Sequence, residues 1–220
     1  MTQKMNLQKG LVGHWTMDSQ DISNRTVYDR SGHNNHGELN GGTINESSII
    51  GESVFFNDSN NEYMETISNI DIGTSNWTVS AWVKPESFKE YLHILAQENQ
   101  GNFTTKVATS GIDSAGVPYF YSTDDRTGAG GASDSLNKNE WGHVVYRYNG
   151  DEIAIYKNSE KIVSNTGNTL SVAEGKYRIQ GGNNEYQSAN HSDTRLYLRA
   201  LSDNEINELY QMREQRSYNV

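Results

Sequence analysis

The chain lacks cysteine and contains only 2 proline residues among its 220 amino acids. Without cysteine there is neither a disulfide nor thiol chemistry. No run of about 20 apolar residues is present, so no segment is expected to insert into a membrane. The first ten residues include two lysines but no apolar run, so this chain shows no secretory signal.

Positive charge is also scarce. Lysine and arginine total 18 against 28 acidic residues, which gives a formal net charge of -10. This excess of carboxylates argues against nucleic acid as a partner, because a phosphate backbone is bound by clustered cations. Hydrophobic residues make up only 34%, but 13 Tyr, 5 Phe and 4 Trp can each bury a large area. The composition therefore predicts one globular domain with many turns.

The common catalytic motifs are missing. There is no nucleophile elbow, no Gly-rich phosphate loop and no Glu-x-Asp-x-x-Glu pattern of paired carboxylates. Glu62 and Glu65 are three residues apart, which places them on opposite faces of a strand. None of the six histidines has a nucleophile or acid nearby in the sequence that suggests a relay, and His143 is interpreted as a structural hydrogen-bonding residue. We therefore expect that the protein is not an enzyme.

The most distinctive segment is Asp29 to Gly37, which reads Asp-Arg-Ser-Gly-His-Asn-Asn-His-Gly. It contains no apolar residue, so it is predicted to be a surface loop whose glycines permit a tight coil. The oxygens of Asp29, Asn34 and Asn35 suit a hard cation such as calcium. The two histidines invite comparison with zinc, but neither a thiol nor an HExxH pattern accompanies them. The residues alone leave calcium and simple loop structure as the two alternatives.

Most of the remaining chain is typical of short β-strands. In Trp77 to Lys84, one alternating set of side chains is apolar and the other is mostly polar, as in a strand that Pro85 ends. Turn signals recur roughly every 8 to 12 residues, the pattern of an antiparallel sandwich. The predicted strands cover 11–16, 53–57, 77–84, 91–97, 104–109, 118–122, 141–148, 152–157, 162–164, 177–181 and 195–198.

One helix is expected near the end of the chain. Ser202 followed three residues later by Glu205 is a capping-box pattern, and Ile206, Leu209 and Tyr210 then share one helical face. Residues 124–138, rich in Gly, Ser and Asp, are predicted to form one long loop of the kind that often binds ligands. We divide the chain into an N-terminal arm (1–10), one domain (11–210) and a C-terminal tail (211–220).

Four segments together resemble a known family. They are Gly13 to Asp18 with the Asp29 loop, Trp77 to Pro85, Trp141 to Gly150, and Asp193 to Tyr210. In this order they are similar to the concanavalin A-like, laminin G-like jelly-roll domains of the bacterial and viral type, over nearly the whole chain. The resemblance implies an all-β fold of two packed antiparallel sheets, with one short C-terminal helix here.

The resemblance also implies a structural calcium ion. In such domains acidic residues near the first loop and before the last strand lie close together. By position, the implied ligands are Asp18, Asp29 and Asp193, with carbonyl groups around His33 and Asn34. Where the family often has two acids in a row, this chain has Ser192 before Asp193, so one ligand is missing.

Sugar recognition combines aromatic faces with planar polar groups. A group of this composition lies beside the long Gly-rich loop, and one more tyrosine lies on another connection. The candidate ligand-binding residues are Tyr119, Tyr121, Asp124, Asp125, Arg126 and Tyr186.

These observations favour a non-enzymatic, lectin-like module that binds a glycan or other surface ligand, with calcium supporting its loops. The alternative is a structural virus or phage particle protein, such as a decoration, fibre or tail component, that forms a homo-oligomer. A chain without a secretory signal reaches a surface either by cell lysis, as particle proteins do, or as part of a larger secreted protein. We therefore expect an extracellular or virion-surface location.

Overall fold

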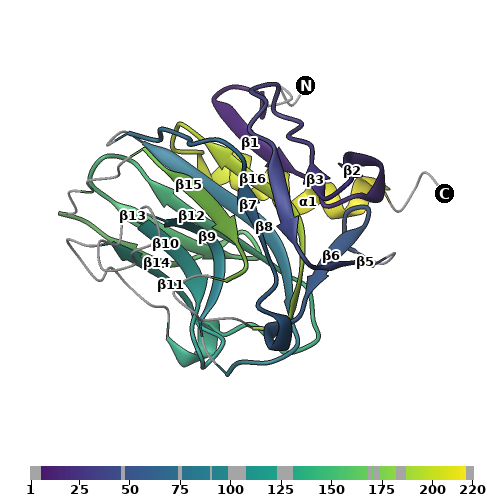
Figure 1. Ribbon diagram of the computed structural model, residues 1–220. Helices are drawn as coiled ribbons and strands as arrows, with labels where there is room; N and C mark the ends of the chain where they lie inside the picture. Colours follow the sequence, from purple (N-terminus) through teal and green to yellow (C-terminus); the bar gives the residue numbers. More distant parts are fainter. Residues whose placement is uncertain are drawn as a thin grey trace.

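The protein is a sandwich of two antiparallel sheets with one α-helix (Figure 1). The computed structural model describes residues 6–45, 48–73, 76–89, 91–98, 108–122, 131–167, 170, 174–181 and 187–216. The predicted all-β, antiparallel β-sandwich jelly roll with a C-terminal helix is confirmed.

Sheet A has the strand order β14-β13-β12-β8-β16-β6-β5, and β1 also pairs with β16. Its strands join distant parts of the chain, because the long strand β16 lies between β8 and β6. The strands are β1 (Leu11–Trp15), β5 (Thr43–Asn45), β6 (Ser53–Phe56), β8 (Trp77–Pro85), β12 (Gly142–Tyr148), β13 (Ile153–Lys157), β14 (Glu160–Asn165) and β16 (Ala189–Tyr197).

Sheet B has the order β11-β10-β9-β15-β7-β4-β3-β2. All of its pairs that the register defines are antiparallel. The strands are β2 (Ile22–Ser23), β3 (Thr26–Val27), β4 (Gly37–Asn40), β7 (Tyr63–Thr66), β9 (Leu92–Glu98), β10 (Ala108–Ile112), β11 (Pro118–Ser122) and β15 (Lys176–Ile179). Short 3-10 turns lie at Ser19–Asp21, Asp58–Asn60 and Ala132–Asp134.

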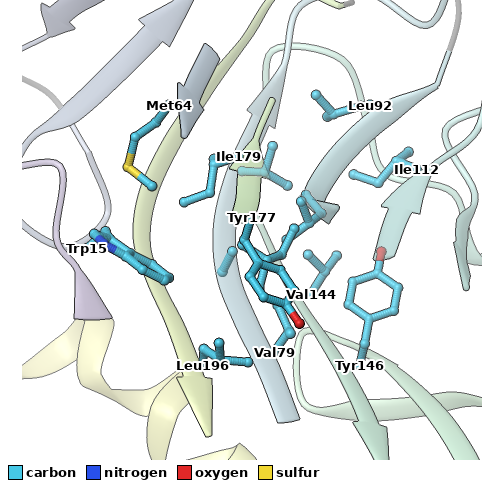
Figure 2. Packing of buried hydrophobic residues seen from close by; sticks show 14 of the residues in the cluster. Trp15, Met64, Val79, Leu92, Ile112, Val144, Tyr146, Tyr177, Ile179 and Leu196 are labelled. Carbon is cyan, nitrogen blue, oxygen red and sulfur yellow. The ribbon is translucent and has the colours of Figure 1, made fainter. Parts of the chain in front are cut away.

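The main core fills the space between the two sheets (Figure 2). Alternate residues of β8, among them Val79, point into it, and Val144 and Tyr146 of β12 lie beside them. From sheet B, Tyr177 and Ile179 of β15 enter the same cluster. Fully buried aromatic side chains supply much of this area, which explains how a chain with few apolar residues still builds a core.

Helix α1 (Asp203–Arg216) covers the outer face of sheet A. Ile206 and Leu209 are buried in a second apolar cluster with Val145 and Tyr156 of the sheet. Tyr210 stacks on Trp82 of β8, with the ring centroids 5.6 Å apart. The polar set predicted for β8 therefore faces the helix and its flanking residues rather than water. No helix in the described part of the chain is long and apolar enough to cross a membrane.

The observed strands differ from the prediction where sequence patterns were weak. The strands β2, β3, β4, β5 and β7 were not predicted, because they are only two to four residues long and contain many polar residues. Strand β16 runs from Ala189 rather than Arg195, since its first half is polar yet buried. The predicted strand 104–109 is only partly described, and β10 begins at Ala108. At the chain ends, Leu7 of the predicted arm is buried in the second cluster, and α1 extends into the predicted tail.

Candidate functional site

The Asp29 loop is held together by one buried carboxylate. Asp29 is only 7% exposed. Its Oδ1 accepts hydrogen bonds from the backbone N–H groups of His14 and Ser31, both at 2.8 Å. Its Oδ2 accepts from Ser31 Oγ at 2.7 Å and from the backbone N–H of Asn35 at 2.9 Å. The carboxylate thus supplies the hydrogen-bond acceptors that a sheet or helix supplies elsewhere, and it fixes the loop against β1.

The same loop is tied to β1 by further bonds. The Asn35 side chain donates to the Val12 carbonyl at 2.7 Å, and the Trp15 indole Nε1 donates to the Asn35 carbonyl at 2.8 Å. The backbone N–H of Asp29 donates to Nδ1 of His36 at 3.0 Å. The predicted surface loop is therefore an ordered corner of the sandwich.

The structure links Asp29 to Asp193 through one residue, His14. The backbone of His14 bonds Asp29, and its Nε2 lies 2.8 Å from Asp193 Oδ1. Arg195 Nη2 donates to the same oxygen at 3.0 Å. Burial alone would raise the pKa of the Asp193 carboxyl, but Arg195 and His14 lower this pKa well below its ordinary range. Asp193 is therefore a buried anion that already has a guanidinium and an imidazole beside it.

The other implied metal ligands are spread around this corner. Asp18 is buried and its Oδ1 accepts from the backbone N–H of Glu52 at 2.6 Å. His33 and Asn34 are exposed, and Asn34 has a left-handed backbone with φ of 59°. Among the described residues, no group of three or more His, Asp or Glu side chains is close enough to hold an ion.

We tested whether these residues fit a calcium ion. Calcium takes six to eight oxygen ligands in most protein sites. Here both oxygens of Asp29 accept hydrogen bonds from the chain, and Asp193 pairs with a guanidinium and an imidazole. A cation would have to displace these partners, so the arrangement does not fit a resident calcium. The calcium ion that the family resemblance implies has not been tested by any finding, and the observed bonding argues against it.

The predicted ligand-binding tyrosines lie on the edge strand of sheet B. Phe120 points into the core, so its neighbours Tyr119 and Tyr121 point outward. Tyr119 contacts Tyr91 edge-to-face, with the ring centroids 5.3 Å apart. A Cβ at Gly111 of β10 would come within 2.8 Å of the Tyr119 ring, so glycine lets this ring lie close over the strand. The other candidates, Asp124, Asp125, Arg126 and Tyr186, lie outside the described residues.

The strand register places Tyr121 in a row that crosses the outer face of sheet B. Each step of the row joins residues that are direct cross-strand partners, so all of them share one face. From β4 to β11 the row runs Glu38, Glu65, Arg178, Ala96, Thr109 and Tyr121.

The centre of this row is a set of paired charges. Glu65 accepts from Nε of Arg178 at 3.0 Å and lies 3.5 Å from Nζ of Lys176. The Arg178 guanidinium also stacks over the ring of Tyr63, 4.2 Å from its centroid. The result is a polar and aromatic surface on the same face as the predicted tyrosines, from which it is separated by strands β9 and β10. Sequence reasoning missed these residues, because the pairing of 63–66 with 176–179 leaves no local pattern.

Histidines in the described region are mostly structural. His93 of β9 is 4% exposed, and burial lowers its pKa to about 4. His143 Nε2 lies 2.8 Å from Ser80 Oγ beneath α1, and burial lowers its pKa to about 3. Both Ser80 and His143 are about 1% exposed, so a substrate has no path to this Ser–His pair. The interpretation of His143 as a structural hydrogen-bonding residue is confirmed.

The two sheets and their strand order define a protein of the concanavalin A-like jelly-roll class. Residues 58–207 match the family described as the concanavalin A-like lectin/glucanases superfamily. The chain belongs to this family, and the resemblance inferred from the sequence is confirmed. A search of curated protein sequences found no match.

Several solved structures share the fold. The binding domain of Paraclostridial Mosquitocidal Protein 1 has a TM-score of 0.73 and 19% identity, with 94% of this chain and 53% of that chain covered. Domain 4 of AbnA, a GH43 extracellular arabinanase from Geobacillus stearothermophilus in complex with arabinotriose, has a TM-score of 0.69 and 17% identity, with 91% of this chain and 98% of that chain covered. Trypanosoma rangeli sialidase in complex with the inhibitor DANA has a TM-score of 0.70 and 16% identity, with 91% of this chain and 32% of that chain covered. The chain thus spans about half of the mosquitocidal binding domain and about a third of the sialidase.

Proposed function

We propose that this domain is a non-catalytic module that binds a glycan or another surface ligand through the outer face of sheet B. The observation that supports this most directly is the difference between the two outer faces. Helix α1 covers the face of sheet A and buries its side chains. The face of sheet B presents polar and aromatic side chains at both ends of a row of paired strands, where Glu38 is exposed and Tyr121 is partly exposed, whereas Ala96 in the middle is 3% exposed; no described helix covers this face.

The chemistry of this face suits sugars. Tyrosine rings offer flat apolar surfaces, and the neighbouring charged groups offer hydrogen bonds to hydroxyls. Tyr121 and Tyr119 lie at one end of the face, and Tyr63 with Arg178 lies near its centre. The predicted acidic and basic residues at 124–126 follow directly after β11 in the sequence.

The structural relatives support the same class of function by analogy only. One is the binding domain of a mosquitocidal protein, and one is an arabinanase domain in complex with arabinotriose. The sialidase shows that the fold also occurs within enzyme chains. For the present chain, the described Ser–His pair is buried and the paired-carboxylate motif is missing from the sequence, which favours binding over catalysis. We place the protein outside the cell or on a particle surface.

A glycan array with wild-type protein tests the proposal. Tyr121→Ala is expected to weaken binding about tenfold, as the loss of one sugar-stacking ring would. Asp125→Ala tests the adjoining loop. The control is Leu198→Ala, because Leu198 is 40% exposed but follows β16 of the other sheet.

Light scattering on the same samples separates the alternative function. A stable symmetric oligomer that binds nothing on the array would favour the structural particle protein. A sugar-binding protein whose affinity is unchanged by Tyr121→Ala would show that the ligand sits elsewhere.

A further inference from the structure

A second cross-strand row lies on the outer face of sheet B at its opposite end. Val27 pairs with Gly37, and Gly37 pairs with Thr66. The next residues, Tyr28, His36 and Ile67, therefore sit side by side across β3, β4 and β7. The backbone bond from the N–H of Ile67 to the His36 carbonyl, 2.8 Å long, continues this pairing.

These three residues form an exposed patch, which we call the Tyr28 platform. Tyr28 is 41% exposed and Ile67 is 48% exposed, two of the largest exposures of an apolar side chain among the described residues. The His36 ring meets Tyr28 edge-to-face, with the centroids 5.2 Å apart and the planes at 80°. Because the His36 and Tyr28 rings meet edge to face, the Tyr28 side chain is left accessible at the surface.

The hydrogen bonding of His36 fixes what the platform can offer. Nδ1 of His36 accepts the backbone N–H of Asp29 at 3.0 Å. In the neutral imidazole the proton must then be on Nε2, so this atom is a hydrogen-bond donor. The buried Asp29 carboxylate holds the loop in place, and the donor is therefore preorganised beside an aromatic ring.

The surroundings narrow the ligand class. Three side chains are far too few for a protein interface, which buries about 800 Å² on each partner. An aromatic side chain, an apolar neighbour and a fixed N–H donor match one sugar ring with its hydroxyls. Glu38 lies two residues along the same strand face and pairs with the exposed Arg25 at 3.6 Å, so these two charges offset each other. The whole chain has a net charge of -10, and this net negative charge disfavours a carboxylate-bearing sugar.

We propose that the Tyr28 platform is a binding subsite for a neutral sugar unit. This inference rests on the proposed function, because it places a second aromatic contact on the same face as Tyr121. From β4 to β11 there are five strand spacings, or about 24 Å. A linear oligosaccharide that crosses the strands would contact both ends of the face, and a short one would contact a single end.

The test uses a glycan array of neutral and carboxylate-bearing glycans, followed by titration with arabinotriose and with the neutral glycan that binds best. Tyr28→Leu removes the ring, and Tyr28→Phe keeps it. His36→Asn keeps an acceptor for the Asp29 N–H but removes the Nε2 donor. Ile44→Ala is the control, because Ile44 is 40% exposed on the edge strand of sheet A. Melting curves confirm that each variant folds.

We expect Tyr28→Leu and His36→Asn to weaken binding of the long neutral glycan about tenfold, while Tyr28→Phe and Ile44→Ala bind like the wild type. If Tyr28→Leu and His36→Asn bind normally while Tyr121→Ala does not, the subsite is wrong and the proposed function stands. Preference for carboxylate-bearing glycans would overturn the neutral-sugar assignment. If no glycan binds the wild type, the sugar subsite and the glycan form of the proposed function are both wrong, and only a surface ligand other than a glycan is left.

Discussion

A single carboxylate, that of Asp29, determines the shape of a nine-residue polar loop. It accepts four hydrogen bonds from three residues, and its own backbone N–H orients His36. A side chain that is 7% exposed thus supplies what secondary structure supplies elsewhere. The stability of the corner and the geometry of the Tyr28 platform depend on the same residue.

Replacing Asp29 tests this dependence. Asp29→Ala leaves several buried N–H groups without an acceptor and is expected to lower the free energy of unfolding by about 2 to 4 kcal/mol. His33→Ala, at an exposed position of the same loop, is expected to change it by less than about 0.5 kcal/mol. Urea unfolding of both variants measures the difference. Equal stabilities would mean that the loop does not rely on this carboxylate.

At the scale of single residues, the sequence predicted which acidic residues lie close together but not which groups they bond. The family resemblance implied that Asp29 and Asp193 lie in one corner, and His14 does join them. The sequence did not indicate that Arg195, two residues after Asp193, occupies the place expected for a cation. The contact between Asp193 and Arg195 depends on an irregularity in β16. The strand has a bulge between Ser192 and Arg195, and Asp193 has a φ of 48°; neither feature has a sequence signature.

At the scale of elements, helix α1 is fixed to the sandwich at its first turn. Ser202 and Glu205 form the predicted capping box: the N–H of Ser202 donates to Glu205 Oε2 at 2.8 Å, and the N–H of Glu205 donates to Ser202 Oγ at 3.3 Å. Arg199 Nη2 also donates to Glu205 Oε1 at 2.7 Å. One glutamate therefore connects the helix to the end of β16.

The bond from Arg199 and those from Ser202 lower the pKa of Glu205 from 4.5 to about 2. Because the folded pKa is the lower one, this stabilisation is fully present above about pH 4.5 and is lost as the pH falls towards 2. Glu205→Gln should cost about 1 to 2 kcal/mol at neutral pH. The gap from wild type should shrink in acid, as urea unfolding at several pH values would show. A gap that does not change with pH would place the effect outside this carboxylate.

The elements that the sequence predicted well are those with a clear apolar period. Strand β8 and its partner β12 fill the core as their alternation indicated, and the helix begins at its cap. The missed strands β4 and β7 carry polar side chains such as Glu38 and Glu65 on their outer face, and they take their place from long-range pairing. Their absence from the prediction hid the centre of the candidate site.

At the scale of the whole molecule, the question of calcium concerns global stability. An ion that binds only the folded state must raise the melting temperature. The carboxylates of Asp29 and Asp193 already have partners within the chain. We therefore expect the same melting temperature in excess chelator and in millimolar calcium. An increase of several degrees with calcium, abolished by Asp193→Asn, would instead show that an ion displaces these partners.

The first and last strands of the sandwich are neighbours, since Leu11 of β1 lies opposite Tyr197 of β16. Both strands belong to sheet A, whereas the proposed sugar contacts belong to sheet B. Anything fused to either end of the domain would emerge from the layer behind the ligand face. The domain can therefore be displayed on a bead, a scaffold or a second copy in tandem with its recognition surface pointing outward.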